Sequence, residues 1–448
     1  MLKQPWYQLR PYFSLGSLSC QAGHFSRLAL LIILTVIASG AKQSLPTPRV
    51  CFGPAALAMT IKGPGFLGCW TLEKARGKAF DRRAGFPLAL GRFPIPVFRI
   101  CHVSLGWAII STGLHPDNKI APAINATPEA KLIAFYSRDM GQAESFAQKH
   151  GAQAGYASMD SLLQDSRVDA VFLCSPNFLH AQHALQAAAA GKHVLSEKPM
   201  TTTLEDAVAM VRGCREQGVT LGTGYHLRTH PGHILARKAI QQGVLGNLSL
   251  AQGQWGFGVR GDTAPPPRTG RRQWWEEPEL IGGAAALMGT GVHVVDLLRF
   301  LLGQEVTEVA VLTDGQTAER PLERMATATL RFDGGTLATV CCGRLLPDSK
   351  NDFAIYGTKG RITGRATLWE SRQGRVEVVS ETINRTAVYP ANYLANFIAE
   401  IEDFQNAVEQ GRQPVASGLD GLRVVEVTLA MIESAKTGRT VRIDPVQV

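Results

Sequence analysis

Short apolar runs alternate with helical sequence patterns between residues 105 and 224. Apolar residues recur with helical spacing between the runs, and the stretches 140–150 and 178–190 each end at a glycine, as helices commonly do. The runs that predict buried strands are 106–110, 131–136, 168–174, 192–196 and 219–223. This repeated strand–helix order is typical of a parallel sheet with helices on both faces. We therefore predict an α/β domain of the Rossmann-like type over residues 105–224.

The pattern changes after residue 224. Strand-like runs follow one another with turn signals such as Asp333-Gly334-Gly335 between them and without long helices. These runs are 248–259, 306–312, 326–332, 336–342 and 352–356. Helical sequence at 392–410 and 419–436 closes the chain. We predict an α+β domain over residues 225–448, built on an open, mostly antiparallel sheet.

Residues 1–104 show no clear helix or strand period and are rich in Gly, Pro, Arg and Phe. The apolar stretch 28–38 is too short to span a bilayer, which needs about 20 residues, but its flanks resemble a secretory signal. A leader with a spacer and a small accessory segment are both possible interpretations. We favour a third, a poorly structured basic extension or misassigned start. The expected location is cytoplasmic, and periplasmic or secreted only if residues 1–41 are a genuine signal.

Composition narrows the class of protein. A hydrophobic content of 45% and a charged content of 19% fit a globular protein that binds no membrane. The net charge of +9 is concentrated in residues 1–100, which hold 13 basic and two acidic side chains, so the remainder is close to neutral. Nucleic-acid binding is therefore not expected. The eight cysteines form no CxxC pair, and His180 and His183 lack a third ligand, so no metal site is expected.

The turn Glu197-Lys198-Pro199 directly follows the strand run 192–196. The carboxyl ends of strands in an open α/β sheet form the edge where ligands bind. A lysine at that edge can transfer a proton to or from a substrate, and the proline stiffens the turn. A solvated surface lysine beside a turn proline is the alternative. We interpret Lys198 as a candidate catalytic residue.

Three further loops at the same edge predict a dinucleotide site. Ser111-Thr112-Gly113 departs from the GxGxxG fingerprint, but Gly113 allows close approach of a pyrophosphate near a helix N-terminus. At the end of the second strand, Ser137 and Arg138 replace the acidic residue that favours NAD, and Arg138 can pair with a 2′-phosphate. Ser175-Pro176-Asn177 ends the third strand. NADP(H) is expected to be preferred, with NAD(H) possible.

A glycine-rich run, Gly282 to Gly291, precedes a predicted helix from Val292 to Leu302. His293 lies in its first turn, where a ring nitrogen can reach a substrate hydroxyl. Asp296, three residues later, lies on the same side and could orient His293 or favour the helix N-terminus. A capped helix with a polar start is the alternative.

Together these motifs resemble the Gfo/Idh/MocA (glucose–fructose oxidoreductase/inositol dehydrogenase) family over about residues 105–445, nearest its 1,5-anhydro-D-fructose reductase branch. The segments that carry the resemblance are Val168–Val171, Ser175–Asn177 with His180, Ala190–Val194, Glu197–Pro199 and Val219–Arg228. The family implies a Rossmann domain followed by a sheet domain on which the last helices pack. It also implies dimers or tetramers formed through the open sheet.

The resemblance assigns roles to individual residues. It implies that Lys198 and His293 are catalytic. The expected cofactor-binding residues are Ser111, Thr112, Gly113, Ser137, Arg138, Ser175, Pro176, Asn177, His180, Glu197 and Lys198. The expected substrate-binding residues are Tyr225, Arg228, Trp274, His293 and Asp296. Trp274 could equally pack on a partner subunit. Many relatives carry Asp four residues before the histidine, where this chain has Gly289, so one carboxylate is missing.

The expected function is hydride transfer between nicotinamide and a sugar or cyclic polyol. Two alternatives remain at this point. One is a cofactor-binding sensor or regulatory protein with little activity, which Gly289 favours. The other is a glycosidase that uses its nicotinamide transiently.

Overall fold

The computed structural model describes residues 58–63, 66–71, 104–261 and 268–448. Residues 101–448 form one compact unit and residues 1–100 another. In the second of these units, β1 (Ala58–Gly63) and β2 (Phe66–Thr71) pair as an antiparallel hairpin. The sequence pattern predicted no strand there, although the intervening Pro64-Gly65 is a turn signal. The apolar stretch 28–38 lies outside the described residues.

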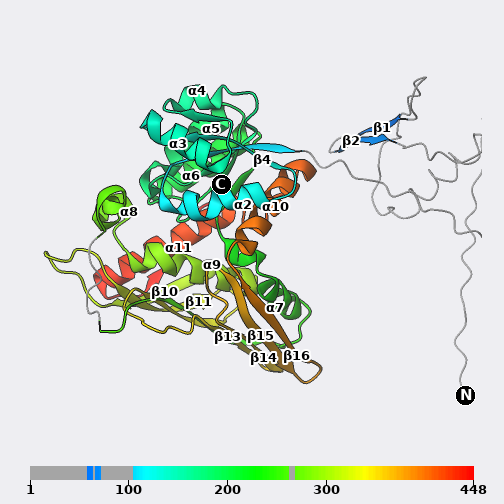
Figure 1. Cartoon of the computed structure of the whole chain (residues 1–448). Coiled ribbons are helices and arrows are strands. Elements are labelled where there is room, and N and C mark those ends of the chain that lie inside the picture. The colour runs from blue at the N-terminus through cyan, green and yellow to red at the C-terminus, as the bar shows by residue number, and fades with distance from the viewer. Residues whose placement is uncertain (1–57, 64–65, 72–103, 262–267) are drawn as a thin grey trace, which may run out of the picture. The chain divides into compact units, whose positions relative to one another are not determined.

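The predicted α/β domain contains six parallel strands in the order β5-β4-β3-β6-β7-β8 (Figure 1). The strands are β3 (Leu105–Ile110), β4 (Ala130–Tyr136), β5 (Ala154–Tyr156), β6 (Ala170–Leu173), β7 (His193–Ser196) and β8 (Leu221–Thr223). Its helical elements are η1 (Pro116–Ile120), α2 (Ala121–Ala126), α3 (Met140–His150), α4 (Met159–Leu163), η2 (Asn177–Leu179), α5 (His180–Ala189) and α6 (Leu204–Glu216). Every residue of β3 and β6 is buried, as expected for central parallel strands covered on both faces. The Rossmann-like prediction is confirmed.

The second domain contains nine strands in the order β16-β15-β14-β13-β9-β12-β11-β10-β17. All neighbours are antiparallel except β9 and β12, which are parallel. The strands are β9 (Leu248–Gly256), β10 (Val306–Thr313), β11 (Met325–Phe332), β12 (Leu337–Gly343), β13 (Phe353–Gly357), β14 (Gly360–Arg365), β15 (Arg372–Ser380), β16 (Asn384–Asn392) and β17 (Val441–Arg442). The predicted open, mostly antiparallel sheet is confirmed.

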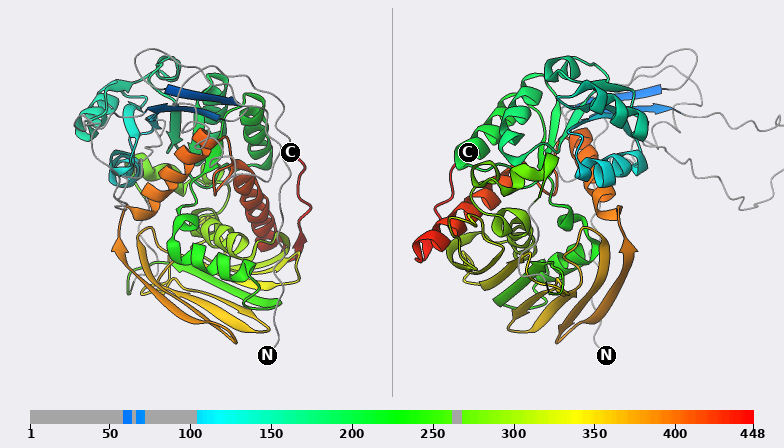
Figure 2. Two further views of the ribbon diagram at one scale, coloured as in Figure 1. Left: turned by 90° about the vertical axis from the view of Figure 1, so that its right-hand side faces the viewer. Right: turned by 60° about the vertical axis from the view of Figure 1, so that its left-hand side comes forward.

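Helices of the second domain lie on the side of its sheet that faces the α/β domain, here called the cofactor domain (Figures 1 and 2). They are η3 (His226–Thr229), α7 (Pro231–Gln241), η4 (Gly270–Glu276), α8 (Pro278–Ile281), η5 (Leu287–Gly291), α9 (Val292–Leu302), α10 (Ala395–Gln410) and α11 (Gly418–Thr437). The last two helices return to the cofactor domain. Phe404 of α10 packs 5.4 Å from the Trp107 ring, and Leu422 of α11 joins the core on the other face of that sheet.

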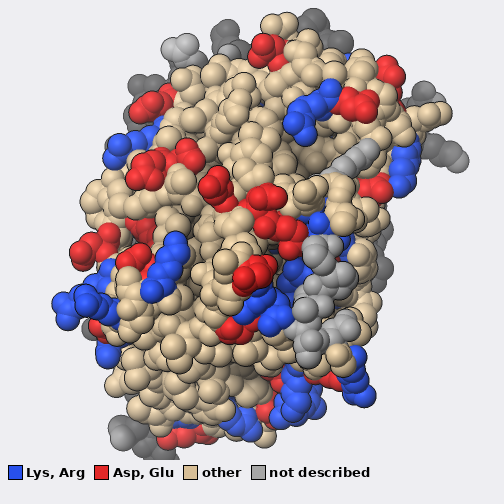
Figure 3. All heavy atoms as spheres, turned by 90° about the vertical axis from the view of Figure 1, so that its left-hand side faces the viewer, with Lys and Arg blue, Asp and Glu red and all other residues tan. Residues whose placement is uncertain are grey.

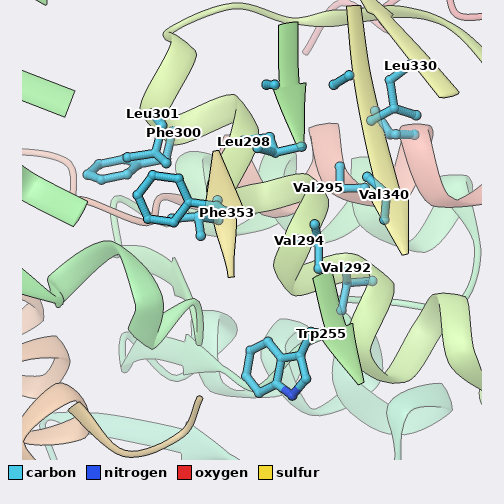
Figure 4. Packing of buried hydrophobic residues seen from close by; sticks show 14 of the residues in the cluster. Trp255, Val292, Val294, Val295, Leu298, Phe300, Leu301, Leu330, Val340 and Phe353 are labelled. Carbon is cyan, nitrogen blue, oxygen red and sulfur yellow. The ribbon is translucent and has the colours of Figure 1, made fainter. Parts of the chain in front are cut away.

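Helix α9 is fixed tightly on the second sheet. All of its residues are buried, and Figure 4 shows Val294, Val295 and Leu298 near Val340 of β12. A Cβ atom on Gly253 of β9 would lie 2.5 Å from Val294 Cγ1, so only glycine allows the helix this close to the strand. Each fully buried Val or Leu contributes about 1.5–3 kcal/mol. The close packing of Val294 therefore fixes the position of its neighbour His293.

Buried histidines make the folded chain sensitive to acid. Burial lowers the pKa of six of them, to about 4 for three, and partial burial lowers that of the half-buried His193: the buried ones are His180, His183 (about 4), His226 (about 4), His230 (about 4), His233 and His293. The unfolded chain, with histidine pKa values near 6.5, binds more protons below that pH than the folded chain does. Stability is therefore present above pH 6.5 and lost as the pH falls toward 4. Buried acids with raised pKa values oppose this trend but are fewer: Asp296, Glu323 and Glu400.

We expect urea unfolding at pH 7.5, 6.0 and 5.0 to show a steady fall in the free energy of unfolding. Each unit of pKa depression corresponds to about 1.4 kcal/mol per histidine. The His230 Nδ1 accepts a hydrogen bond from the Gly232 amide, and its Nε2 lies 3.0 Å from the Gln373 carbonyl oxygen. Because glutamine does not titrate, His230→Gln should reduce the pH slope. A free energy of unfolding that is equal at pH 7.5 and 5.0 would contradict this interpretation.

Candidate active site

The loop Ser111-Thr112-Gly113 connects β3 to η1. Ser111 has a φ of +150°, a conformation that favours glycine and that a serine adopts only where its surroundings impose it. Gly113 has no such φ, and a Cβ atom on it would meet Ser111 Oγ and Pro116 Cδ at 3.5 and 3.9 Å, which is ordinary contact. The protein itself therefore does not require glycine at 113. The space left by the missing side chain fits the close approach of a dinucleotide pyrophosphate.

His180 ties two loops together at the same sheet edge. Its Nε2 lies 2.8 Å from the Ser175 carbonyl oxygen, and its Nδ1 lies 3.0 Å from the carbonyl oxygen of Pro199. Predicted to bind cofactor, His180 instead has both ring nitrogens against the main chain. Asn177 is buried and its Nδ2 has no partner within the described residues, so this amide remains for a ligand.

At the end of β4, Ser137 is half-buried and Arg138 is exposed. Ser137 Oγ accepts a hydrogen bond from the Asp139 amide at 3.3 Å, and Asp139 caps α3. Arg138 has no ion-pair partner among the residues that the structure describes. Its guanidinium is thus open to a phosphate.

His115, in the segment after β3, fixes the Glu197-Lys198-Pro199 turn through a contact with Glu197. His115 Nε2 lies 2.8 Å from Glu197 Oε1, and the Lys198 amide donates to Glu197 Oε2 at 3.1 Å. Burial alone would raise the pKa of Glu197, but His115 and Lys198 outweigh it and lower it to about 2. Glu197 is therefore an anion that fixes the turn, and the Lys198 side chain is half-buried at the strand end.

His293 enters the same region from the second domain. Trp255 of β9 stacks on its ring with centroids 4.4 Å apart, and the His226 ring lies 5.2 Å away. Its Nδ1 is buried without a partner in the described part of the chain. Burial lowers the pKa of His293 well below its usual value, and the positive charge of Lys198 lowers it further. His293 is thus a neutral imidazole with an unpartnered ring nitrogen, and the charge of Lys198 acts on it.

Arg228 and Asp296, both predicted to bind substrate, form an ion pair with each other. Arg228 donates from Nε and Nη2 to the Asp296 carboxylate at 2.7–3.1 Å, and also from Nη2 to Asp420 at 3.0 Å. Burial alone would lower the pKa of Arg228, but the two carboxylates raise it. Asp296 is therefore engaged by Arg228, and the structure shows no hydrogen bond from Asp296 to His293 among the described residues.

Tyr225 and Trp274 have different surroundings. Tyr225 is buried with its ring edge on His293 at 6.3 Å, and its hydroxyl has no partner among the described residues. Trp274 is half-buried in η4 and packs on Trp275 at 4.7 Å.

The structure adds residues that the sequence patterns did not single out. His115 braces Glu197, Trp255 stacks on His293, and Lys119 forms an ion pair with Glu370 at 2.8 Å across the two domains. His115 lies two residues after Gly113, so its place beside the glycine loop marks it in the sequence as a residue near the site. Trp255 lies in a regular strand and Glu370 in a loop, and neither has a local pattern that marks a site. Within the described residues, no cluster of ligating side chains suits a metal ion, and no helix is long and apolar enough to cross a bilayer.

Two family profiles match the chain. One, described as an oxidoreductase family with an NAD-binding Rossmann fold, matches residues 105–225, and the other, its C-terminal alpha/beta domain, matches residues 237–443. The chain belongs to the Gfo/Idh/MocA family and is an NAD(P)-dependent oxidoreductase.

Named relatives extend over the same region. The 1,5-anhydro-D-fructose reductase of Ensifer adhaerens is 31% identical over 342 residues, covering 75% of this chain and 98% of that protein. D-xylose 1-dehydrogenase (NADP(+)) 2 of Haloferax volcanii is 30% identical, covering 75% and 99%. The aldose-aldose oxidoreductase of Caulobacter crescentus, solved with glycerol, superposes with a TM-score of 0.67 at 26% identity, covering 76% and 100%.

Proposed function

We propose that this oxidoreductase interconverts a carbinol and a carbonyl on a sugar or cyclic polyol, with NADP(H) preferred and NAD(H) possible. The observation that carries the proposal is that Lys198, just after β7, is close enough to His293, at the start of α9, for its charge to lower the pKa of that histidine. Gly113 and Asn177 leave room for a dinucleotide at the same sheet edge. The relatives named for 1,5-anhydro-D-fructose and D-xylose support the substrate class.

Each residue of the site has a separate role in the proposed hydride transfer. The nicotinamide, when bound, supplies or accepts the hydride. Lys198 transfers the proton at the substrate oxygen, and such proton transfer contributes about 10²–10⁴-fold to the rate. Neutral His293 hydrogen-bonds the same or a neighbouring hydroxyl through a ring nitrogen. Ser111, Thr112 and Gly113 hold the pyrophosphate, whereas His180 and Glu197 act through the loops that they fix.

The function is tested by titration with NADPH and NADH, followed by a panel of carbonyl sugars monitored by nicotinamide absorbance. We expect tighter binding of NADPH and turnover of at least one sugar. Cofactor binding without hydride exchange on any sugar or polyol would instead support a sensor. That second candidate is favoured by Gly289, where a Cβ atom would meet nothing within 4 Å and no carboxylate is present.

Cofactor preference gives a separate prediction. Arg138→Ala should weaken NADPH binding about 10–100-fold, because a charge-assisted hydrogen bond is worth about 1.5–3 kcal/mol, and should leave NADH binding unchanged. Exposed Arg215 of α6 provides the matched control, since Arg215→Ala should change neither affinity. Equal loss of NADPH and NADH affinity in Arg138→Ala would contradict 2′-phosphate recognition.

We also propose a homodimer or homotetramer formed through the face of the second sheet that the helices leave uncovered (Figure 2). This face carries a groove of about 380 Å³, and polar side chains from β9, β12 and β14 are among its lining residues. Light scattering at several protein concentrations tests this assembly. A cytoplasmic location is proposed because the described cysteines are free thiols, which suits a reducing compartment.

A further inference from the structure

Three arginines lie around the start of η4, close enough for their charges to affect one another. Arg268 and Arg272 lie at the start of the η4 segment, and Arg344 follows the last residue of β12. The Arg268 guanidinium lies 4.9 Å over the Trp275 ring, and its Nη1 lies 3.3 Å from Glu276 Oε1. Figure 3 shows the face that lies on the left-hand side of Figure 1, where basic and acidic side chains are interspersed.

The positive charge of this cluster is not balanced. Burial and the charge of Arg344 together lower the pKa of Arg268 to about 10, with Glu276 only partly opposing them. Burial also lowers the pKa of Arg344, and Arg272 adds to that effect. Arg344 Nε is buried and has no hydrogen-bond partner within the described residues. Arg268 thus pairs with Glu276, whose charge also acts on Arg344, and the buried Arg344 Nε has no acceptor among the described residues.

The cluster lies at the edge of the proposed active site. Cys342 of β12 pairs in register with Trp255, whose ring stacks on His293. Arg344 is two residues further along, which is about 7 Å at the rise of a β-strand. On the opposite side, α8 contacts η2 of the cofactor domain, and the Gly282 position packs against Thr202, just after the Glu197-Lys198-Pro199 turn. The segment from Arg268 to Gly282 therefore leads to the cofactor domain near Thr202, which follows the Glu197-Lys198-Pro199 turn.

We propose that Arg268 and Arg344 bind an oxyanion on the substrate, so that the preferred substrate is a sugar or polyol bearing a carboxylate or a phosphate. Paired guanidinium groups suit both anions, since their planar donors match two oxygens at once. This inference rests on the proposed function of the same site. It concerns the charge of the substrate, which Lys198 and His293 do not determine because they act on the carbinol.

The test compares matched substrates in the presence of NADP⁺: D-glucose, D-glucuronate and D-glucose 6-phosphate, and myo-inositol with its 1-phosphate. We expect kcat/KM to be about 10–100-fold higher for at least one anionic member than for its neutral partner. Arg344→Gln and Arg268→Gln should remove that difference by raising KM for the anion alone. Exposed Arg331, which pairs with Glu308 on β10, is the control, and Arg331→Gln should change nothing. The glucuronate and phosphate arms separate the two anions.

Calorimetry with D-glucose 6-phosphate and inorganic phosphate, on enzyme loaded with NADPH, decides the matter independently of turnover. Binding that weakens at least 10-fold in Arg344→Gln supports the oxyanion site. Neutral sugars turned over as well as anionic ones, with phosphate binding unaffected by either variant, would overturn this inference and leave the proposed function intact. Absence of turnover on every compound would count against the proposed function, while the calorimetric result would still decide the anion site.

Discussion

Replacing Lys198 by methionine is expected to lower kcat by about 10²–10⁴-fold while NADPH binding stays within a few-fold of the wild type. The methionine keeps most of the volume of the side chain and removes only the ammonium group. The fold should survive, because the described hydrogen bond of residue 198 is made by its main-chain amide to Glu197. Proton transfer at the substrate oxygen should then depend on water. Steady-state kinetics with the sugar identified in the panel, together with NADPH titration, measure both quantities.

Exposed Lys131, at the start of β4, is the matched control for this variant. Lys131→Met should retain wild-type kcat. The pKa of His293 offers a second readout, because the charge of Lys198 lowers it. In Lys198→Met the imidazole should titrate at higher pH by NMR, although burial still holds its pKa below the usual value. A kcat for Lys198→Met equal to that of the control would remove the lysine from the mechanism.

Sequence periodicity predicts those elements of this fold that are buried on one or both faces. The strands β3, β4, β6 and β7 follow from apolar runs because central parallel strands contact helices on both sides. Strands β14 to β16 escaped prediction. Most residues of β16 are exposed, and it contains Pro390, which an edge strand tolerates and an interior strand does not. Helix α7 also escaped, since its polar start, His230-Pro231, resembles a turn.

The candidate site was predictable where its residues follow strand ends. Lys198, Gly113 and Asn177 lie at one sheet edge because parallel strands align their carboxyl ends, and local sequence is enough to place them. The environment of His293 was not predictable. Trp255 comes from a strand 38 residues earlier in the chain, and only the parallel pairing of β9 with β12 under α9 brings it against the histidine. The ion pair of Asp296 with Arg228 was likewise not predictable, because the two residues are 68 positions apart in the sequence.

The surroundings of Gly289 indicate how the absence of a carboxylate at this position affects proton transfer. Gly289 lies in η5, one helical turn before His293, and open space surrounds the position of its missing Cβ. Two nearby carboxylates are engaged elsewhere. Asp296 is engaged by Arg228, and Glu197 by His115. We therefore expect Lys198 to carry the proton transfer without a second carboxylate, which makes its replacement more damaging than it would be in a site with two proton carriers.

Replacing Asp296 by alanine is expected to lower the free energy of unfolding by about 3–5 kcal/mol, because it leaves the buried Arg228 guanidinium with only Asp420 as a carboxylate partner. Arg228 side-chain exposure is 4% and that of Asp296 is 1%, so water cannot replace the lost carboxylate. The pair joins η3 to α9, and Asp420 joins both to α11. Loss of one member should loosen the helix that carries His293. Urea unfolding at pH 7.5 measures the change.

The double variant Arg228→Met/Asp296→Leu separates a structural role of this pair from substrate binding. If the pair only supports the fold, removing both charges should recover much of the stability lost in Asp296→Ala, because the remaining groups are apolar and of similar size. KM for the sugar should then stay within a few-fold of the wild type at a temperature where the variant is folded. A folded double variant with KM raised 10-fold or more would show that Arg228 or Asp296 contacts the substrate. In that case the ion pair would have to open when the substrate binds, and the stability lost in Asp296→Ala would depend on substrate concentration.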